Sequence, residues 1–181
     1  MTALSSERLL LREFVEQDAA SVHSYARDPE VVKHMPWGPN TENDTRDFIQ
    51  RAVGYQLEQP RTHYELAVTL RDKGVLIGGC GIRVTNPVLR EGNFGYCLNK
   101  QYWGNGYATE AAETLLDFGF GTMKLHRIYA TCDPENHASR KVLEKNGLTQ
   151  EGHLRENLMI RDVWRDSLVY AILDREWRVN P

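Results

Sequence analysis

The spacing of hydrophobic positions along the chain predicts five helices. Within residues 41–58, apolar residues recur three or four positions apart, as on the buried face of an amphipathic helix. A second such stretch follows Asp18, a favoured helix N-cap residue. The inward positions would be Phe48, Ile49, Ala52, Val53 and Leu57 in the longer helix, and Ala19, Val22 and Tyr25 or Ala26 after Asp18. The other helices are expected at residues 29–34, 107–121 and 138–146, the last ending in a left-handed cap at Asn146-Gly147.

Strands are predicted where apolar residues alternate or form short runs. They are expected at residues 8–14, 64–70, 75–84, 93–98, 126–132, 154–160 and 167–173. Asp72-Lys73-Gly74 supplies a hairpin turn, and the glycines at 78, 79 and 81 predict a bulge or a close approach of another backbone or ligand. This order predicts an α/β (α+β) fold over residues 1–181 as a single domain, with antiparallel strands first and helix crossovers late.

The composition narrows the classes of partner. Hydrophobic residues make up 41% and charged residues 26%, which is typical of a globular protein. The formal net charge is −3 and the pI about 6.1, so no strong basic field exists to hold nucleic acid. Mild acidity suits a cationic amine substrate.

The N-terminus and the cysteines indicate a cytoplasmic protein. Residues 1–12 contain Glu7, Arg8 and Arg12, which is typical of neither a signal peptide nor a membrane span. Cys80, Cys97 and Cys132 are widely spaced, with no CxxC motif or neighbouring histidine pair. We therefore expect reduced thiols, no metal site and no membrane partner.

A glycine-spaced loop in residues 98–110 (LNKQYWGNGYATE) joins a predicted strand to a predicted helix. Glycines let backbone N–H groups approach an anion, and the helix N-terminus adds about half a positive charge. The loop is either a pyrophosphate site or a tight turn. Thr109 stands where a dinucleotide-binding fingerprint needs a small residue, and no Gly-Lys-Ser/Thr follows the loop, so two other nucleotide-binding motifs are excluded.

The loop resembles a known family. Gln101-x-x-Gly104-x-Gly106 is similar to the pyrophosphate motif of the GNAT superfamily of N-acetyltransferases, and residues 136–147 (NHASRKVLEKNG) to its second cofactor segment. The segments ERLLLREF, GYCLNKQYWGNGYATEA, CDPENHASRKVLEKNG and WRDSLVYAIL further resemble the ribosomal-protein alanine acetyltransferase branch, in the same order. The resemblance implies a GNAT fold, with a mixed, mostly antiparallel central sheet whose middle strands splay apart between flanking helices.

The resemblance also implies acetyl-CoA as cosubstrate. Its pantetheine arm would enter between the splayed strands, and its pyrophosphate would lie in the glycine loop. Tyr107 could equally be a packing residue, and Trp103 is expected to pack under the pyrophosphate turn rather than contact the acceptor. Asn136 is either a helix cap alone or a cap that also contacts the cofactor. The implied cofactor-binding residues are Tyr96, Cys97, Leu98, Gln101, Trp103, Gly104, Asn105, Gly106, Tyr107, Ala108, Asn136 and Ser139.

The implied catalytic residues depart from the family pattern. Leu143 stands where many members have a tyrosine acid, so Ser139 or water would protonate the leaving thiolate. Asn93 stands where many members have a carboxylate, and an amide cannot take the proton of the amine. Asn93 would instead hold a water, and Glu91 is either a remote base or a solvated hairpin residue.

The missing base bears on the acceptor. A lysine-like amine with a pKa near 10.4 is neutral in roughly one molecule in a few thousand at pH 7, whereas an α-amine near 7.7–8.0 is neutral in about one in ten. A site without a strong base therefore favours an α-amine. We expect direct transfer in a ternary complex to a primary amine, either a protein N-terminus or a small molecule.

Other features bear on substrate and assembly. Trp37, in the apolar turn at residues 35–39, is either an acceptor-wall residue or part of the core. The last predicted strands are expected to be exposed, which makes a homodimer an alternative to a monomer. The alternative outside the enzymes is a non-catalytic module that binds acyl-CoA without turnover.

Overall fold

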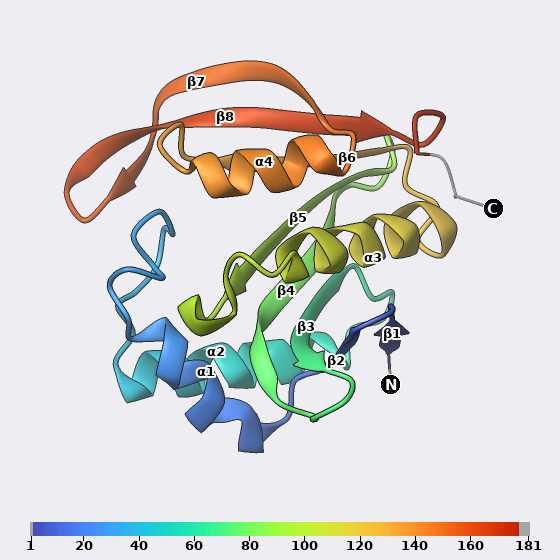
Figure 1. Ribbon diagram of the computed structural model, residues 1–181. Helices are drawn as coiled ribbons and strands as arrows, with labels where there is room; N and C mark the ends of the chain where they lie inside the picture. Colours follow the sequence, from blue (N-terminus) through green and yellow to red (C-terminus); the bar gives the residue numbers. More distant parts are fainter. Residues whose placement is uncertain (1, 178–181) are drawn as a thin grey trace.

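The computed structural model describes residues 2–177, which form an eight-stranded sheet with helices on both faces (Figure 1). Among the described residues, no helix has the length and apolar character needed to cross a membrane. The strands are β1 (Ala3–Ser5), β2 (Leu9–Glu13), β3 (His63–Leu70), β4 (Leu76–Asn86), β5 (Glu91–Leu98), β6 (Arg127–Cys132), β7 (Thr149–Ile160) and β8 (Val163–Leu173). The helices are α1 (Ala19–Ala26), α2 (Glu42–Tyr55), α3 (Tyr107–Gly121) and α4 (His137–Lys145), with short 3-10 turns at Glu16–Asp18 and Lys100–Tyr102.

The sheet order is β1-β2-β3-β4-β5-β6-β8-β7. Every neighbouring pair is antiparallel except β5 and β6, which run parallel and are joined through α3. The predicted fold, antiparallel first with helix crossovers late, is confirmed. The parallel pair lies in the middle of the sheet, where a crossover helix is required to bring the chain back.

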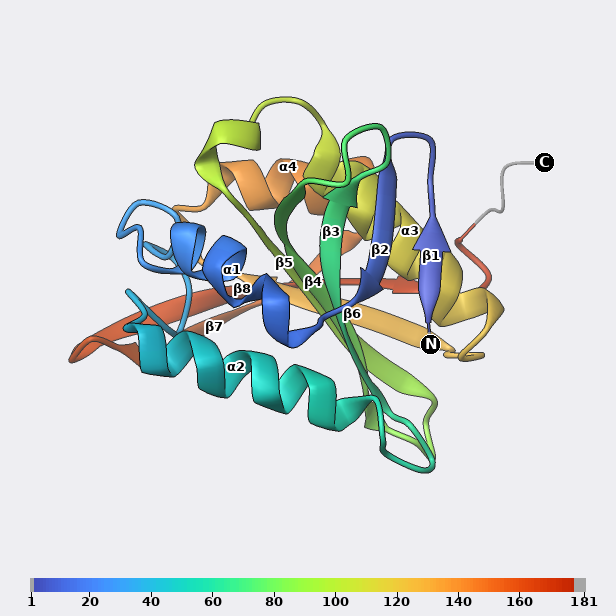
Figure 2. The ribbon, with the colours of Figure 1, turned by 90° about the horizontal axis from the view of Figure 1, so that it is seen from below.

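Helices α1 and α2 cover one face of the sheet and α3 and α4 the other (Figure 2), and a hydrophobic cluster lies on each face. The cluster on one face joins Ala67 to Val22, Ile49 and Ala52 of α1 and α2. The larger cluster on the other face joins Leu66 and Val68 to α3 and α4, including Leu143. Alternate residues of β3 therefore enter different cores, as a two-sided sheet requires.

Several sequence predictions need correction. Residues 29–34 form turns rather than a helix. Leu57 lies beyond the end of α2 and is 82% exposed, so it does not face inward. Asp18 precedes α1, but its carboxylate accepts from Arg12 and the Val15 N–H instead of capping the helix. Each difference depends on a tertiary contact or on where a helix ends, and the local spacing of apolar residues specifies neither.

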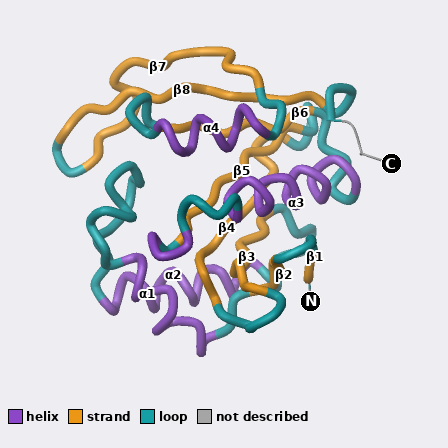
Figure 3. Tube along the Cα trace, in the orientation of Figure 1, coloured by secondary structure: helices purple, strands orange, loops and turns teal. Residues whose placement is uncertain are grey.

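The long β7–β8 hairpin also exceeds its prediction. The expected strands covered residues 154–160 and 167–173, whereas β7 and β8 together run from Thr149 to Leu173 with a turn at Arg161-Asp162. Both turn residues have positive φ, 50° and 61°. The turn reaches the loop of residues 27–41 that connects α1 to α2 (Figure 3).

Candidate active site

A wedge opens between β5 and β6 in the middle of the sheet. The parallel pairing covers Glu91–Asn93 against Arg127–Tyr129, and in the described chain β5 has no pairing with β6 beyond that point. The Asn93 side chain closes the narrow end, since its amide donates to the Tyr129 carbonyl at 3.1 Å. Residues 95–98 therefore present one backbone edge to the wedge. The predicted splay of the middle strands is confirmed.

The glycine-spaced loop lies beyond the C-terminal end of β5. Gly104 and Gly106 have φ values of 78° and 81°, and Gly106 is the N-cap of α3. Left-handed backbone is costly for residues with a Cβ, so these positions require glycine. The first N–H groups of α3 have no carbonyl partner within the helix, which leaves them available to an anion.

Side chains hold this loop in shape. The Asn105 amide donates to the Tyr102 and Trp103 carbonyls, and the Trp103 indole N–H donates to the Leu98 carbonyl at 2.8 Å. Trp103 thus packs against the turn, as one sequence interpretation expected. A Cβ at Gly104 would meet no atom within 4 Å, so the space beside the loop is open. These residues fit a pyrophosphate group.

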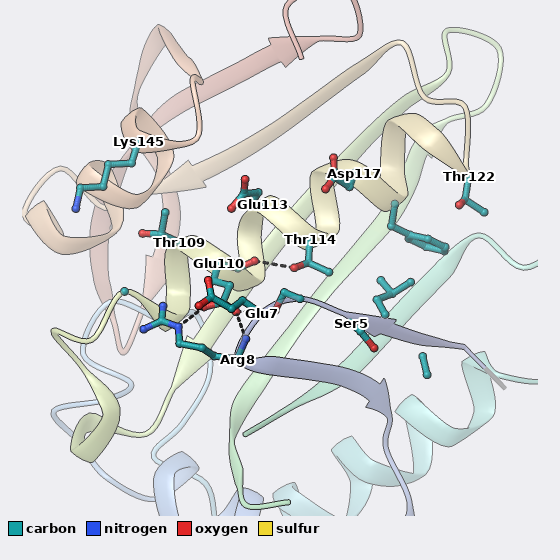
Figure 4. Close-up of a pocket in the computed structure, with 15 residues that line it drawn as sticks. Ser5, Glu7, Arg8, Thr109, Glu110, Glu113, Thr114, Asp117, Thr122 and Lys145 are labelled. Atoms are coloured by element: carbon teal, nitrogen blue, oxygen red, sulfur yellow. Dashed lines mark hydrogen bonds and ion pairs between the residues drawn. The ribbon is translucent and has the colours of Figure 1, made fainter. Parts of the chain in front are cut away.

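Arg8 places a cation beside the loop, and sequence analysis missed it as a site residue (Figure 4). Its guanidinium donates to the Asn105 carbonyl at 3.0 Å, lies 4.7 Å from the centre of the Tyr107 ring, and forms an ion pair with Glu110 at 2.7 Å. Glu110 also accepts from the Ser6 hydroxyl and the Arg8 N–H. Burial raises the pKa of Glu110, but these hydrogen bonds outweigh it and the net pKa is lowered. Glu110 therefore orients Arg8 instead of facing the loop.

Ser139 lies at the open side of the wedge. The Asn136 side chain accepts from the Ser139 N–H at 3.0 Å, so Asn136 caps α4. The Tyr96 hydroxyl lies 3.0 Å from Ser139 Oγ, bridging β5 and α4. Burial raises the pKa of Tyr96, so its hydroxyl stays protonated near neutral pH. The structure thus brings Tyr96, Asn136 and Ser139 together, with Leu143 buried behind them.

The cysteines lack the setting of a nucleophile. Burial raises the pKa of Cys97 to about 12 and that of Cys132 to about 11, and it also raises the pKa of Cys80. All three are free thiols. At neutral pH they are protonated, and a thiol reacts only weakly without ionisation. Among residues 2–177, no group of three or more His, Cys, Asp or Glu side chains could hold a metal ion.

A groove of 690 Å³ opens on the face of the sheet covered by α1 and α2. Trp37 and the turn around it form one wall, and Gly95 and Cys97 of β5 lie on the floor. Six of its polar lining residues are Tyr25, Asp44, Asp47, His63, Glu65 and Asn93.

Glu91 lies apart from this groove. Its carboxylate is 2.8 Å from the Arg127 guanidinium, and it is not among the groove-lining residues.

Sequence analysis also missed His63 and Glu65. Both fall at or beside the start of a predicted strand, two positions apart and therefore on one face. The available signal was the placement of these two polar residues at alternate positions of an otherwise mostly apolar strand. The strand partners that decide their surroundings are 16 or more residues away in the sequence.

The chain is similar to known acetyltransferases over most of its length. The family model described as acetyltransferase (GNAT) domain matches residues 8–149. The chain is 38% identical over 176 residues to the uncharacterized N-acetyltransferase YnaD of Bacillus subtilis (strain 168), covering 96% of this chain and 98% of that protein.

Solved structures give the same result for the fold. A GNAT-family acetyltransferase from Bacillus anthracis superposes with a TM-score of 0.86 at 36% identity, covering 97% of this chain and 100% of that one. Mycobacterium smegmatis RimJ, solved in complex with CoA-disulfide, gives a TM-score of 0.85 at 28% identity, covering 97% of this chain and 88% of that one. The matched region includes the wedge and the glycine-spaced loop.

Proposed function

Because the chain belongs to the GNAT acetyltransferase family, and is therefore an N-acetyltransferase that uses acetyl-CoA, we propose that it acetylates a primary amine by direct transfer in a ternary complex. The observation that carries this is the wedge. It lies along β5, whose C-terminal end leads into the glycine-spaced loop and whose residues 95–97 line the groove on the α1–α2 face. Donor and acceptor can therefore meet at the sheet without a covalent acetyl-enzyme.

The acetyl-CoA site extends along β5, the loop and α4. The backbone of Tyr96, Cys97 and Leu98 would hydrogen-bond the pantetheine arm, since that edge of β5 lacks a strand partner. Residues 101–108 would hold the pyrophosphate through backbone N–H groups, with Arg8 adding a positive charge. Asn136 and Ser139 would border the thioester. Similarity to RimJ, solved with a CoA-disulfide, supports this placement.

The residues around the thioester divide the chemistry. Backbone N–H groups of β5 would polarise the acetyl carbonyl as negative charge develops on its oxygen. The Ser139 hydroxyl, held against Tyr96, would give its proton to the leaving sulfur and regain one from the reacting nitrogen. Water takes this task if Ser139 does not. The Asn93 amide donates to the Tyr129 carbonyl and so holds β5 to β6 at the narrow end of the wedge. Asn93 can also position a water.

The proposed acceptor is an α-amine, in keeping with the ribosomal-protein alanine acetyltransferase branch that the sequence resembles. A weakly basic amine needs less help to lose its proton than a lysine-like amine. The alternative acceptor is a small polycationic amine, favoured by Asp44, Asp47 and Glu65 in the groove. With either acceptor, we propose that residues 1–181 form a single N-acetyltransferase domain.

We also propose a cytoplasmic location and a homodimer. The three free cysteines persist as thiols in a reducing compartment. The β7–β8 hairpin exposes Leu154, Leu158, Met159, Val163 and Trp164, which gives a second copy an apolar surface to cover.

The test is release of coenzyme A thiol from acetyl-CoA across an amine panel. The panel holds an alanine-starting peptide, an internal-lysine peptide, spermidine, an aminoglycoside and free amino acids. We expect fastest release with the alanine-starting peptide. Fastest turnover of the lysine peptide near neutral pH would contradict the α-amine proposal. Binding of acetyl-CoA by calorimetry without turnover of any amine would favour a binding module instead.

A further inference from the structure

Glu65 lies in a row of three residues that crosses the middle of the sheet. In β3 it pairs with Gly81 of β4, and Gly81 pairs with Gly95 of β5. Directly paired residues point to the same face of a sheet. That face is the one covered by α1 and α2, because Ala67, two positions after Glu65, packs into their cluster. The row thus carries one side chain and two glycines.

The Glu65 carboxylate lies over Gly81. A Cβ added at Gly81 would stand 2.8 Å from both Cδ and Oε2 of Glu65, so only glycine admits this conformation. A Cβ at Gly95 would meet no heavy atom within 4 Å, so the next position in the row is open. Neighbouring strands lie about 4.8 Å apart. The carboxylate therefore stands roughly one strand spacing from the open floor of the groove at β5.

His63 holds this carboxylate in place. Its Nε2 lies 3.1 Å from Glu65 Oε1, and its ring stacks on Tyr55 of α2 with centroids 3.9 Å apart. The Glu65 side chain is 27% exposed and lines the groove. An imidazole next to a half-buried carboxylate forms a path by which a proton can leave for solvent.

The surroundings leave few groups to titrate between pH 6 and 9. Burial raises the pKa of Tyr25 on α1 and of Cys80 on β4, and raises that of Cys97 on β5 to about 12. Those groups stay neutral over this range. The fixed charges lining the groove from α2 and β4 are Asp44, Asp47, Arg51 and Arg83.

We infer that Glu65 receives the acceptor amine: its carboxylate binds the ammonium form in the space over Gly95 and takes one proton from it. This assignment rests on the function proposed above. It places the proton acceptor on the α1–α2 face of the sheet, whereas Ser139 approaches the wedge from the α4 side. Glu65 thereby fills the role that Asn93 cannot.

The protons and bonds balance. Loss of the first proton to Glu65 leaves an electron pair on nitrogen, which forms the C–N bond to the acetyl carbonyl carbon. The C–S bond breaks and its electron pair leaves on sulfur. The second proton of the nitrogen goes to sulfur, directly or through Ser139, and Glu65 passes its proton through His63 to water. One ammonium and one thioester thus give an amide, a thiol and a proton.

The test compares kcat/KM of the wild type and Glu65→Gln with the alanine-starting peptide at pH 6.5 and pH 9. An α-amine is mostly protonated at the lower pH and mostly neutral at the higher. We expect a roughly 100-fold loss at pH 6.5, within the usual range for a general base, shrinking to less than about fivefold at pH 9. With spermidine, whose more basic amines stay charged, the loss should persist to higher pH.

His63→Gln should show a smaller loss with the same pH dependence, and Glu58→Gln, an exposed carboxylate just beyond α2, should show none. Acetyl-CoA affinity and thermal unfolding should match the wild type in all three variants. An equal loss at both pH values, or no loss, would overturn the assignment while leaving the acetyltransferase intact. A wild type that acetylates no amine would overturn the proposed function and this inference together.

Discussion

The guanidinium of Arg161 donates to the carbonyl of Gly38 at 2.9 Å, joining the β7–β8 turn to the loop that carries Trp37. The same guanidinium donates to the Val32 carbonyl at 2.9 Å and the Trp37 carbonyl at 3.2 Å. One side chain from the far end of the sequence therefore satisfies several carbonyls of the groove wall. Since this loop has no regular secondary structure, these hydrogen bonds hold its shape.

Arg161→Ala should therefore weaken acceptor binding without touching the acetyl-CoA site. We expect KM for the acceptor amine to rise about tenfold, equivalent to ~1.4 kcal/mol, with kcat changed less. Acetyl-CoA affinity, measured by calorimetry, should stay the same. Arg155→Ala removes an exposed arginine from the same hairpin and serves as the control. Equal effects of the two variants on KM would contradict a positioning role for Arg161.

Gly106→Ala should weaken acetyl-CoA binding. The residue caps α3 with φ of 81°, a conformation that costs alanine roughly 1–2 kcal/mol. Relief of that strain would rotate the first N–H groups of α3 away from the anion, so we expect the Kd for acetyl-CoA to rise about tenfold or more. Gly121→Ala, at the exposed end of the same helix with open space at its Cβ, should bind as the wild type does.

Ser139→Ala tests which group protonates the leaving sulfur. The helix cap should survive, because it uses the Ser139 N–H and the Asn136 side chain. We expect kcat to fall about 10- to 100-fold with acetyl-CoA affinity unchanged. Tyr96→Phe removes the hydroxyl 3.0 Å from Ser139 Oγ and should give a smaller loss. An unchanged kcat in Ser139→Ala would assign the proton to water.

Local patterns determined how much of this fold the sequence could predict. The boundaries expected for α3, residues 107–121, match the structure, because Gly106 and a continuous apolar face mark them locally. Residues 29–34 lack that continuity, and their turn is held by tertiary contacts including Arg161. β1 has three residues, too few for a periodic signal, and depends on pairing with β2.

The candidate site shows the same division. The glycine-spaced loop and the Asn136–Ser139 cap have fixed local spacing, so sequence predicted their places. Arg8 and Glu65 acquire their surroundings through residues far along the chain: Arg8 contacts Glu110, and Glu65 lies over Gly81. The first contact depends on how α3 packs beside the N-terminal strands. The second depends on the register of β3 with β4, which shifts between Val68 and Thr69, so the hairpin turn alone does not specify it.

A buried ion pair beside the N-terminal strands should make stability depend on pH. Glu13 is 5% exposed and its Oε1 lies 2.5 Å from the Arg61 guanidinium. Burial raises the pKa of Glu13, but the hydrogen bonds from Arg61 and the Thr2 N–H outweigh it, so the net pKa is lowered. A carboxyl whose pKa is lowered by folding stabilises the folded state above its unfolded pKa of about 4.3 and loses that contribution as pH falls through the folded pKa.

Glu13→Gln should therefore destabilise the protein at pH 7 and less so in acid. At pH 7 the variant leaves the Arg61 charge without its carboxylate, and we expect a loss of about 3 kcal/mol in the free energy of unfolding. As the pH falls toward and through the lowered pKa of the folded wild type, its carboxyl also gains a proton, so the difference between the two proteins should shrink. Urea unfolding at pH 7 and pH 3.5 measures it, with Glu16→Gln, an exposed carboxylate three residues away, as the control. A difference that is constant with pH would mean that Glu13 contributes through packing and not through its charge.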